Sequence, residues 1–205
     1  MTTDTIDIAP RLRGRPREFD MDAALDEALR VFSERGYYAA SISELTEAMG
    51  LTAGSVYKAF GDKRGVFLAA FDRYRHVRQK LIDECLAEAA NGYEKLRALV
   101  TFFAEASCGE IGRRGCLVVG SATELALFDE EVAGRVGVAF DFDERRILSL
   151  IHVGQQDGSI PKHVDAEGTA CAMLSLTKGM RVVGKTGRKE DHMRAAAEAA
   201  MKLLN

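Results

Sequence analysis

The chain contains 144 consecutive residues, from position 17 to position 160, without a single proline. The three prolines are Pro10, Pro16 and Pro161. Proline disrupts the interior of a helix, so its absence over this length leaves room for many consecutive helices. Alternating β-branched stretches, which are typical of strands, are scarce. We therefore expect an all-α fold.

The composition is that of a folded protein with one large domain or two small ones. The residues are 47% hydrophobic and 29% charged. No apolar run approaches the roughly 18 residues of a membrane span, and the first residues carry no apolar signal core. We expect a cytoplasmic protein with no membrane partner. The four cysteines form no CxxC pair and share no metal-ligand spacing with the four histidines, so we expect no metal and no cofactor.

Charge is distributed unevenly, although the net charge is only −3. Residues 8–80 carry 13 basic and 10 acidic side chains, whereas residues 81–205 carry 15 basic and 19 acidic side chains. Arginines stand at positions 11, 13, 15 and 17, in a segment that we interpret as a flexible basic arm over residues 1–18. A basic arm and head on an acidic body is typical of a nucleic-acid-binding protein. The alternative is an arm that is merely solvated.

Hydrophobic spacing predicts about nine helices, most of them bounded by glycine, serine or aspartate. They are expected from Asp20 to Gly36 and over 41–49, 53–60, 62–88, 93–107, 116–128, 130–156, 166–185 and 190–204. The glycine-rich segment 109–115 is expected to be a joint between helices.

Residues 41–63 read as two short helices joined by a tight turn at Gly50. Ser41-Ile-Ser-Glu44 fits a capping box at the start of the first helix. The apolar residues predicted to form a small core between the helices are Leu45, Met49, Leu51, Val56 and Phe60. The opposite edge of the second helix carries Thr52, Ala53, Gly54, Ser55, Tyr57 and Lys58. These small, polar and aromatic residues suit entry into a DNA major groove, and Ser41, Ser43 and Lys63 are candidates to hold the flanking phosphates.

This segment resembles the DNA-binding head of the TetR family of transcriptional repressors. The resemblance is carried by Gly36-Tyr37, Ser41-Ile42, Leu45-Thr46, Gly50-Leu51-Thr52, Gly54-Ser55-Val56-Tyr57, Phe60 and Lys63. The spacing Tyr-x-x-Phe-x-x-Lys distinguishes it from other helix-turn-helix proteins. The sequence departs from the family pattern at Thr46 and Met49, where alanine is common, and at Ala59, where histidine is common. Two later segments, 115–126 and 178–183, resemble ligand-domain signatures of a TetR subgroup.

The resemblance implies a helix-turn-helix DNA-binding domain over residues 19–66, with three helices. A long fourth helix joins it to a helical ligand-binding and dimerisation domain over residues 67–205. It also implies a homodimer, paired through the last two helices, that represses transcription by binding a near-palindromic double-stranded DNA operator. A small-molecule effector would release the DNA, and no enzyme activity is expected. Arg13 and Arg15 lie in an Arg-Gly-Arg-Pro segment that either enters the minor groove or only attracts phosphates.

Eight residues of the second domain are candidates to line the effector pocket, and each of them is alternatively plain core. They are Phe102, Phe103, Leu117, Phe140, Phe142, Met173, Thr177 and Met180.

Cys116 follows two arginines and opens a predicted helix, and both features favour the reactive thiolate. Cys108 lies eight residues earlier and is a candidate disulfide partner. The resemblance makes Lys178 a candidate partner amine, because some electrophile-sensing TetR members are thought to place an amine there. The chain is therefore alternatively a repressor that senses oxidants or electrophiles through Cys116. The competing interpretation is a buried cysteine that serves only packing.

Two further functions remain open. One is a helical enzyme or small-molecule-binding protein with a vestigial head, although the sequence shows no nucleophile–base pair. The other is a constitutive architectural DNA protein, which the basic arm favours. A steep salt dependence of DNA affinity would separate a DNA-binding protein from the first of these.

Overall fold

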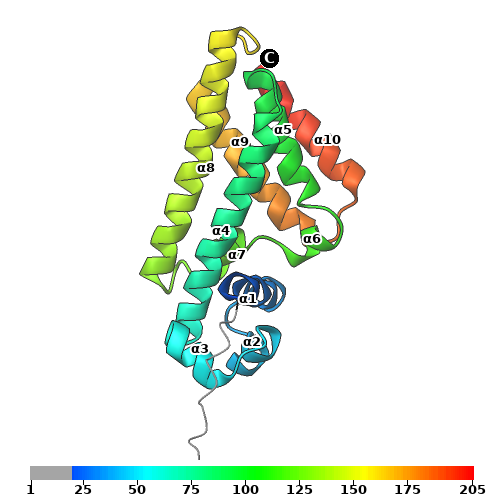
Figure 1. Ribbon diagram of the computed structural model, residues 1–205. Coiled ribbons are helices and arrows are strands. Elements are labelled where there is room, and N and C mark those ends of the chain that lie inside the picture. Colours follow the sequence, from blue (N-terminus) through cyan, green and yellow to red (C-terminus); the bar gives the residue numbers. More distant parts are fainter. Residues whose placement is uncertain (1–19) are drawn as a thin grey trace, which may run out of the picture.

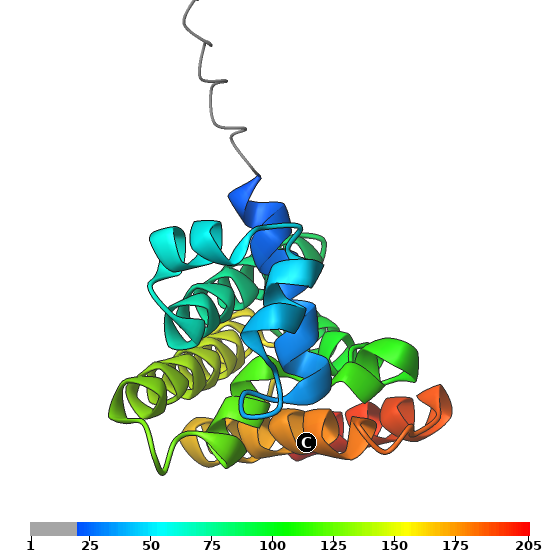
Figure 2. The ribbon, with the colours of Figure 1, turned by 90° about the horizontal axis from the view of Figure 1, so that it is seen from below.

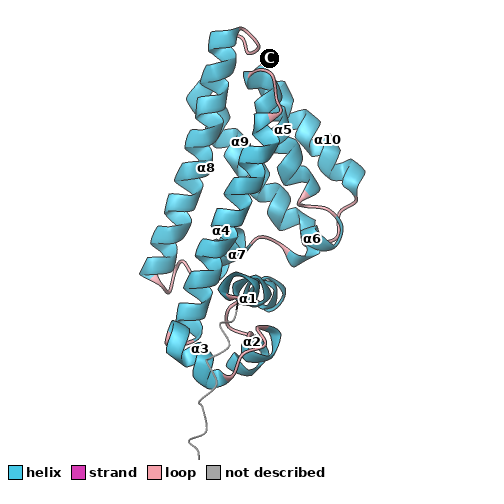
Figure 3. Cartoon of the chain, in the orientation of Figure 1, coloured by secondary structure: helices cyan, strands magenta, loops and turns pink. Residues whose placement is uncertain are grey.

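The computed structural model describes residues 20–205. Over this range the chain folds into ten α-helices and one short 3-10 helix, without a strand (Figure 3). The helices are α1 (Met21–Arg35), α2 (Ile42–Ala48), α3 (Ala53–Phe60), α4 (Lys63–Ala87), α5 (Gly92–Glu105), α6 (Gly109–Arg114), α7 (Leu117–Glu124), α8 (Glu130–Asp157), α9 (Ala166–Gly184), α10 (Glu190–Met201) and η1 (Lys202–Leu204). The all-α prediction is confirmed. The arm, with Arg13 and Arg15, lies outside the described residues.

Helix ends follow the local signals in the sequence. Asp20, Ser41, Thr52 and Asp62 cap α1 to α4 through their side chains, each accepting a hydrogen bond from a backbone N–H of the first turn. Gly36 ends α1 with a φ of +78°, a conformation that an L side chain rarely adopts. Helices α1 to α4 therefore begin where the sequence predicts.

Two segments of the second half differ from expectation. The glycine-rich joint contains the six-residue helix α6, in which Gly112 lies against the backbone of Ser107. A Cβ on Gly112 would lie 2.3 Å from the Ser107 carbonyl oxygen, so glycine serves close packing here rather than flexibility. Helix α7 ends at Glu124 instead of near Phe128, and Leu127 and Phe128 are exposed.

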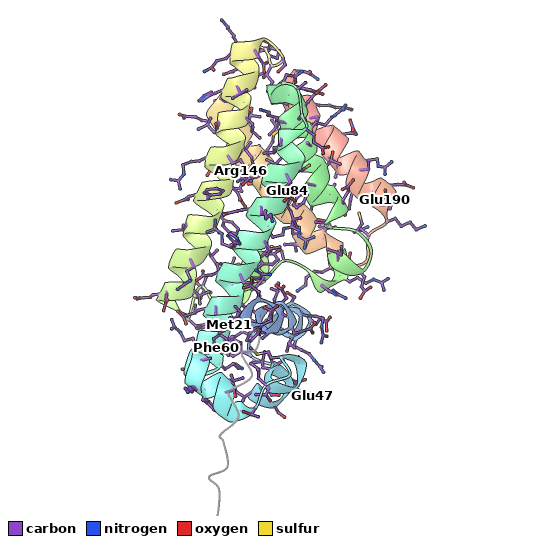
Figure 4. All side chains as sticks on the ribbon, viewed as in Figure 1. Met21, Glu47, Phe60, Glu84, Arg146 and Glu190 are labelled. Atoms are coloured by element: carbon purple, nitrogen blue, oxygen red, sulfur yellow. The ribbon has the colours of Figure 1, made fainter. Side chains whose placement is uncertain are left out.

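The helices form a small head at one end of an elongated body (Figure 1). Helices α1, α2 and α3 make up the head, and α4 runs from it along the body beside α8 and α5. Seen from the head end, α1 to α3 lie in front of the body helices, and α9 and α10 lie along one side (Figure 2). Figure 4 places Glu47 and Phe60 in the head, at the end of the molecule away from Arg146 and Glu84.

Two hydrophobic cores hold these parts together, and α4 contributes to both. The first core joins the head helices to α4, with Phe67 and Phe71 fully buried, and continues into α7 and α8 through Leu117 and Val136. The second core packs α5, α8, α9 and α10 around Ile82, the buried residue in the second half of α4. A single rigid helix therefore links the head to the body.

The crossing of α5 and α8 depends on two glycines. The Gly92 N–H donates to an Asp157 carboxylate oxygen at 2.8 Å. A Cβ built on Gly92 would lie 2.1 Å from the Gly154 nitrogen and 2.3 Å from its Cα. Backbone atoms cannot move aside as a flexible side chain can, so the crossing admits no side chain at this position.

We predict that Gly92→Ala destabilises the protein by about 2 kcal/mol, because the added methyl forces the two helices apart. Thermal or urea unfolding measures this change. Gly134→Ala on α8 is the matched control, because no atom lies within 4 Å of the point that its Cβ would occupy. That control should gain about 0.5–1 kcal/mol from the higher helix propensity of alanine. Equal stabilities of the two variants would contradict the close helix crossing.

Candidate nucleic-acid interface and effector pocket

Helix α3 presents a polar and aromatic surface at the end of the head. Val56 is fully buried and fixes the rotation of the helix, which leaves Thr52, Ala53, Gly54, Tyr57 and Lys58 exposed. Tyr57 keeps half of its surface accessible. Ser55 is half-buried, and its hydroxyl lies 2.9 Å from that of Thr52 at the helix start. The predicted recognition face is thus accessible, apart from part of Ser55.

A capping box fixes the start of α2. The Glu44 N–H donates to the Ser41 hydroxyl at 3.1 Å, and the Ser41 N–H donates to the Glu44 carboxylate at 2.9 Å. The Ser41 hydroxyl also donates to the Glu44 carboxylate at 2.9 Å, and the two hydrogen bonds that the carboxylate accepts from the Ser41 N–H and hydroxyl lower the pKa of Glu44. Ser41 and Ser43 remain exposed, so both candidates for phosphate contact lie at the surface.

Lys63 does not extend into solvent as a phosphate contact would. Its Nζ donates to the Ala40 carbonyl at 2.9 Å and lies 4.5 Å from the centre of the Tyr37 ring. The residue is half-buried. Its ammonium group therefore holds the segment between α1 and α2 against the start of α4.

Two polar contacts connect the head to the body. The Glu124 carboxylate, at the end of α7, accepts hydrogen bonds from the N–H groups of Tyr37 and Tyr38 at 3.2 and 3.0 Å. At the start of α4, Arg64 binds Asp129 through two nitrogens at 2.7 and 3.0 Å. The guanidinium lowers the pKa of Asp129 to about 2, so this pair stays charged over the physiological range.

A small cavity lies in the body between α4, α5, α7, α8 and α9. It measures about 40 Å³, enough for a few water molecules and too small for an organic effector without movement of the walls. The lining residues that carry its chemistry are Tyr74, Arg75, Arg78, Cys116, Asp143 and Lys178.

Most of the predicted effector contacts lie outside this cavity. Of the eight candidates only Phe103 lines it. Met173, Thr177 and Met180 are buried on α9, and Leu117 belongs to the core near the head. Phe102 borders an outer groove between α4 and α5, Phe140 is half-buried, and Phe142 is partly exposed and lies against Arg75 and Arg146.

The polar lining residues of α4 were missed because they read as an ordinary solvated face. Tyr74 and Arg78 are four residues apart, as are Arg75 and Gln79, so both pairs lie on one side of the helix. That side meets α5, α8 and α9 rather than solvent. Helix α4 is long enough to pass through the body. Polar residues on one side of its middle part are the sequence signal that could have identified these lining residues.

Cys116 stands at the start of α7, as the sequence predicts, and its sulfur accepts a hydrogen bond from the Tyr74 hydroxyl at 3.2 Å. Loss of hydration would raise the pKa of this thiol. The Arg181 guanidinium and the Tyr74 hydroxyl outweigh that effect, so the pKa of Cys116 is lowered. Burial and the neighbouring Cys116 raise the pKa of Tyr74. The hydroxyl therefore stays protonated as a donor.

The two proposed partners of Cys116 have other contacts. Lys178 forms an ion pair with Asp143 and lies 4.7 Å from the centre of the Phe103 ring. Cys108 points back along its own chain, its thiol donating to the Ala104 carbonyl at 3.1 Å. All four cysteines are free. The pKa of Cys116 is lowered, whereas burial raises the pKa of Cys85 and of Cys108.

Within residues 20–205, no group of three or more His, Cys, Asp or Glu side chains is placed to hold a metal ion. Over the same range no helix is both long enough and apolar enough to cross a membrane.

Family models match both parts of the chain. The model "Bacterial regulatory proteins, tetR family" covers residues 24–70, and the model "Tetracyclin repressor-like, C-terminal domain" covers residues 92–200. The chain is 30% identical to the HTH-type transcriptional repressor ComR of Escherichia coli K12, over 99% of this chain and 97% of ComR. It is also 30% identical to the uncharacterized HTH-type transcriptional regulator YezE of Bacillus subtilis 168, over 88% of this chain and 95% of YezE.

A solved structure with a similar fold contains DNA. It is a cysteine mutant of the TetR family transcriptional regulator CifR in complex with a 26-base-pair double-strand operator. The TM-score is 0.82 at 30% identity, covering 92% of this chain and 98% of that chain.

We predict that Lys63→Met lowers the free energy of unfolding by about 1–2 kcal/mol, because the Ala40 carbonyl loses a charged donor. Thermal unfolding measures the loss. The matched control is Lys58→Met, since Lys58 is exposed on α3 and should leave the unfolding temperature unchanged. If Lys63→Met were as stable as the control, the ammonium would be free for another role, such as binding phosphate.

Proposed function

The chain is a transcriptional repressor of the TetR family of bacterial regulatory proteins, and we propose that it acts as a homodimer that binds a near-palindromic operator and is released by a small-molecule effector. It acts in the cytoplasm and by binding rather than by catalysis. We assign DNA binding to residues 19–66, and effector binding and dimerisation to residues 67–205.

The observation that carries this proposal is the exposed face of α3. An eight-residue helix with small residues at its start and no acidic side chain can enter a major groove with little steric hindrance. Thr52, Ser55, Tyr57 and Lys58 are the proposed base-reading residues. Ser41 and Ser43 contact the adjacent phosphates, and the arginines of the arm, Arg13 and Arg15, add contacts next to the site. We do not retain Lys63 as a direct phosphate contact, because its ammonium group is already bound within the head.

The dimer interface is proposed on α8 and α9. These helices carry the exposed apolar residues Val138, Val153, Leu176, Val182 and Val183. A monomer with such side chains on two adjacent helices gains stability when a second copy covers them. The sequence led us to expect the last two helices, and the apolar residues favour α9 with α8 rather than with α10.

Effector binding is proposed at the cavity that Tyr74, Cys116 and Lys178 line. Helix α7 connects this cavity to the head, because Cys116 begins it and Glu124, at its end, binds the amides of Tyr37 and Tyr38. An occupant that displaces the start of α7 therefore changes the position of the segment before α2. That movement alters the spacing of the two recognition helices in the dimer.

A second candidate function is sensing of oxidants through Cys116. The polarised sulfur beside Tyr74 and the buried Arg181 favours it. The thiolate sulfur attacks one oxygen of hydrogen peroxide, which breaks the O–O bond and gives a sulfenic acid and hydroxide. The added oxygen changes the hydrogen bond between the Cys116 sulfur and Tyr74, and the start of α7 shifts with it. The ion pair of Lys178 with Asp143 makes Lys178 a less available partner for this sulfur.

We predict tight binding to DNA from upstream of the protein's own coding region, measured by fluorescence anisotropy with competitor DNA. Affinity should fall steeply with salt, with a slope of about −0.9 for each phosphate contact. Lys58→Gln should weaken binding to the operator more than binding to unrelated DNA, because Lys58 is proposed to read bases. Lys162→Gln, an exposed lysine in the segment after α8, is the matched control and should bind like the wild type. Weak binding without salt dependence would instead support a vestigial head.

For the second candidate function, Cys116→Ser should leave DNA binding intact and abolish its loss in hydrogen peroxide. Wild-type binding should return after treatment with a thiol reductant. Cys171→Ser, at an exposed cysteine of α9, is the control and should stay sensitive to peroxide. A Cys116→Ser protein that still loses DNA in peroxide would refute the sensor, while leaving the repressor itself unaffected.

A further inference from the structure

Arg181 on α9 is a buried cation without a counter-ion among the described residues. Only 1% of its surface is exposed, and no carboxylate of residues 20–205 lies within ion-pairing distance of it. One terminal nitrogen donates to the Gly115 carbonyl. The Nε and the other terminal nitrogen have no hydrogen-bond partner. A buried guanidinium in this state is costly unless an anion completes its hydrogen bonds.

Arg181 borders a pocket at the junction of head and body. The pocket measures about 220 Å³, room for several water molecules or a small organic group. Helix α1 forms one wall with Leu29 and Arg30, and α4 forms another with Tyr74 and Arg78. Helices α6 and α9 complete it. This pocket is separate from the smaller cavity beside Cys116, although both touch Tyr74 and Arg78.

The lining of this pocket is strongly cationic. Four arginines border it, at positions 30, 78, 114 and 181, against a single carboxylate, that of Asp26. Asp26 is already bound by Arg73, whose two nitrogens lie 3.0 and 2.9 Å from its oxygens. Arg30 and Arg114 both contact Glu34, at 3.4 and 3.6 Å. That leaves two positive charges without a carboxylate partner in the described structure.

The second of these charges is Arg78. Its guanidinium lies over the Phe102 ring at 4.6 Å from the centre and near the Tyr74 ring at 5.9 Å. Stacking on rings orients the planar group and leaves its edge nitrogens available for oxygen atoms. Arg78 from α4 and Arg181 from α9 thus offer guanidinium groups to the same pocket.

We propose that this pocket binds a small organic anion, a carboxylate or a phosphate monoester, whose oxygens pair with Arg181 and Arg78. Its apolar part contacts Leu29 and Ile111. The planar guanidinium matches two oxygens of such a group. The Arg181 guanidinium also acts on the Cys116 sulfur, so an anion bound here would reduce that influence on the thiol.

The position of the pocket gives the anion a regulatory role, and this part rests on the proposed function. Leu29 and Arg30 belong to the head, whereas Arg181 belongs to the body. An anion held by both sides fixes the angle between them. Its binding should change operator affinity together with thermal stability.

Thermal unfolding of the full chain tests the site without DNA. The probes are sodium benzoate and phenyl phosphate, and the controls are benzamide, which is neutral, and sodium chloride at equal ionic strength. Both anions should raise the unfolding temperature in proportion to the logarithm of their concentration, and the controls should not. A rise with benzoate alone identifies a carboxylate site, and a rise with phenyl phosphate alone identifies a phosphate site.

Two variants assign the effect to the pocket. Arg181→Met should bind the anion about tenfold more weakly or worse. It should also fold at least as well as the wild type, because an apolar side chain replaces an unpaired buried charge. Arg78→Gln should weaken binding as well. Arg97→Gln is the matched control, because Arg97 is exposed on α5 and lines neither this pocket nor the cavity beside Cys116, and it should retain the full effect.

No rise in unfolding temperature with either anion, or an equal rise in wild type and Arg181→Met, would overturn the proposal. The first result would leave the Cys116 thiolate as the counter-ion of Arg181. Operator affinity is measured separately with the same probes. A protein that binds the anion but no operator would disprove the repressor mechanism and leave the anion site standing.

Discussion

The packing of α4 in two hydrophobic cores at once is the constraint from which the other features follow. Its first half buries Phe67 and Phe71 among the head helices, and its second half buries Ile82 in the body. A helix of 25 residues kinks sharply only at a proline or a similar break, and α4 contains no proline. The head must therefore move as α4 moves. Every contact that displaces α4 or the segment before α2 therefore also moves the proposed DNA-binding surface.

Local signals made the head predictable from the sequence. Ser41 with Glu44, Thr52 and Gly36 act within a few residues of their own positions, and the structure shows each of them at the predicted helix end. The role of Lys63 was not predictable in this way. Its partners, Ala40 and Tyr37, are more than twenty residues away along the chain, and only the folded head brings them within reach.

The body was less predictable because its contacts also join residues that are far apart in the sequence. A buried methionine on α9 and a pocket methionine have the same helical spacing, so Met173 and Met180 could not be sorted by sequence. The burial of Arg181 was even less predictable from the sequence. It stands in a segment that resembles a family signature, yet its charge gave no indication that the fold buries it. Burial of a long cationic side chain depends on which helices surround it, and no local pattern encodes that.

The first core has a consequence for the way such proteins can be recombined. Buried residues of α7 and α8, among them Leu117 and Val136, complete the core that begins in α1. The head is therefore not a portable module that ends at residue 66. A chimera that joins this head to the body of another regulator would expose an apolar surface unless it also carried α7 and the first turns of α8. The segment exchanged between such proteins, in the laboratory or in evolution, must be a discontinuous one.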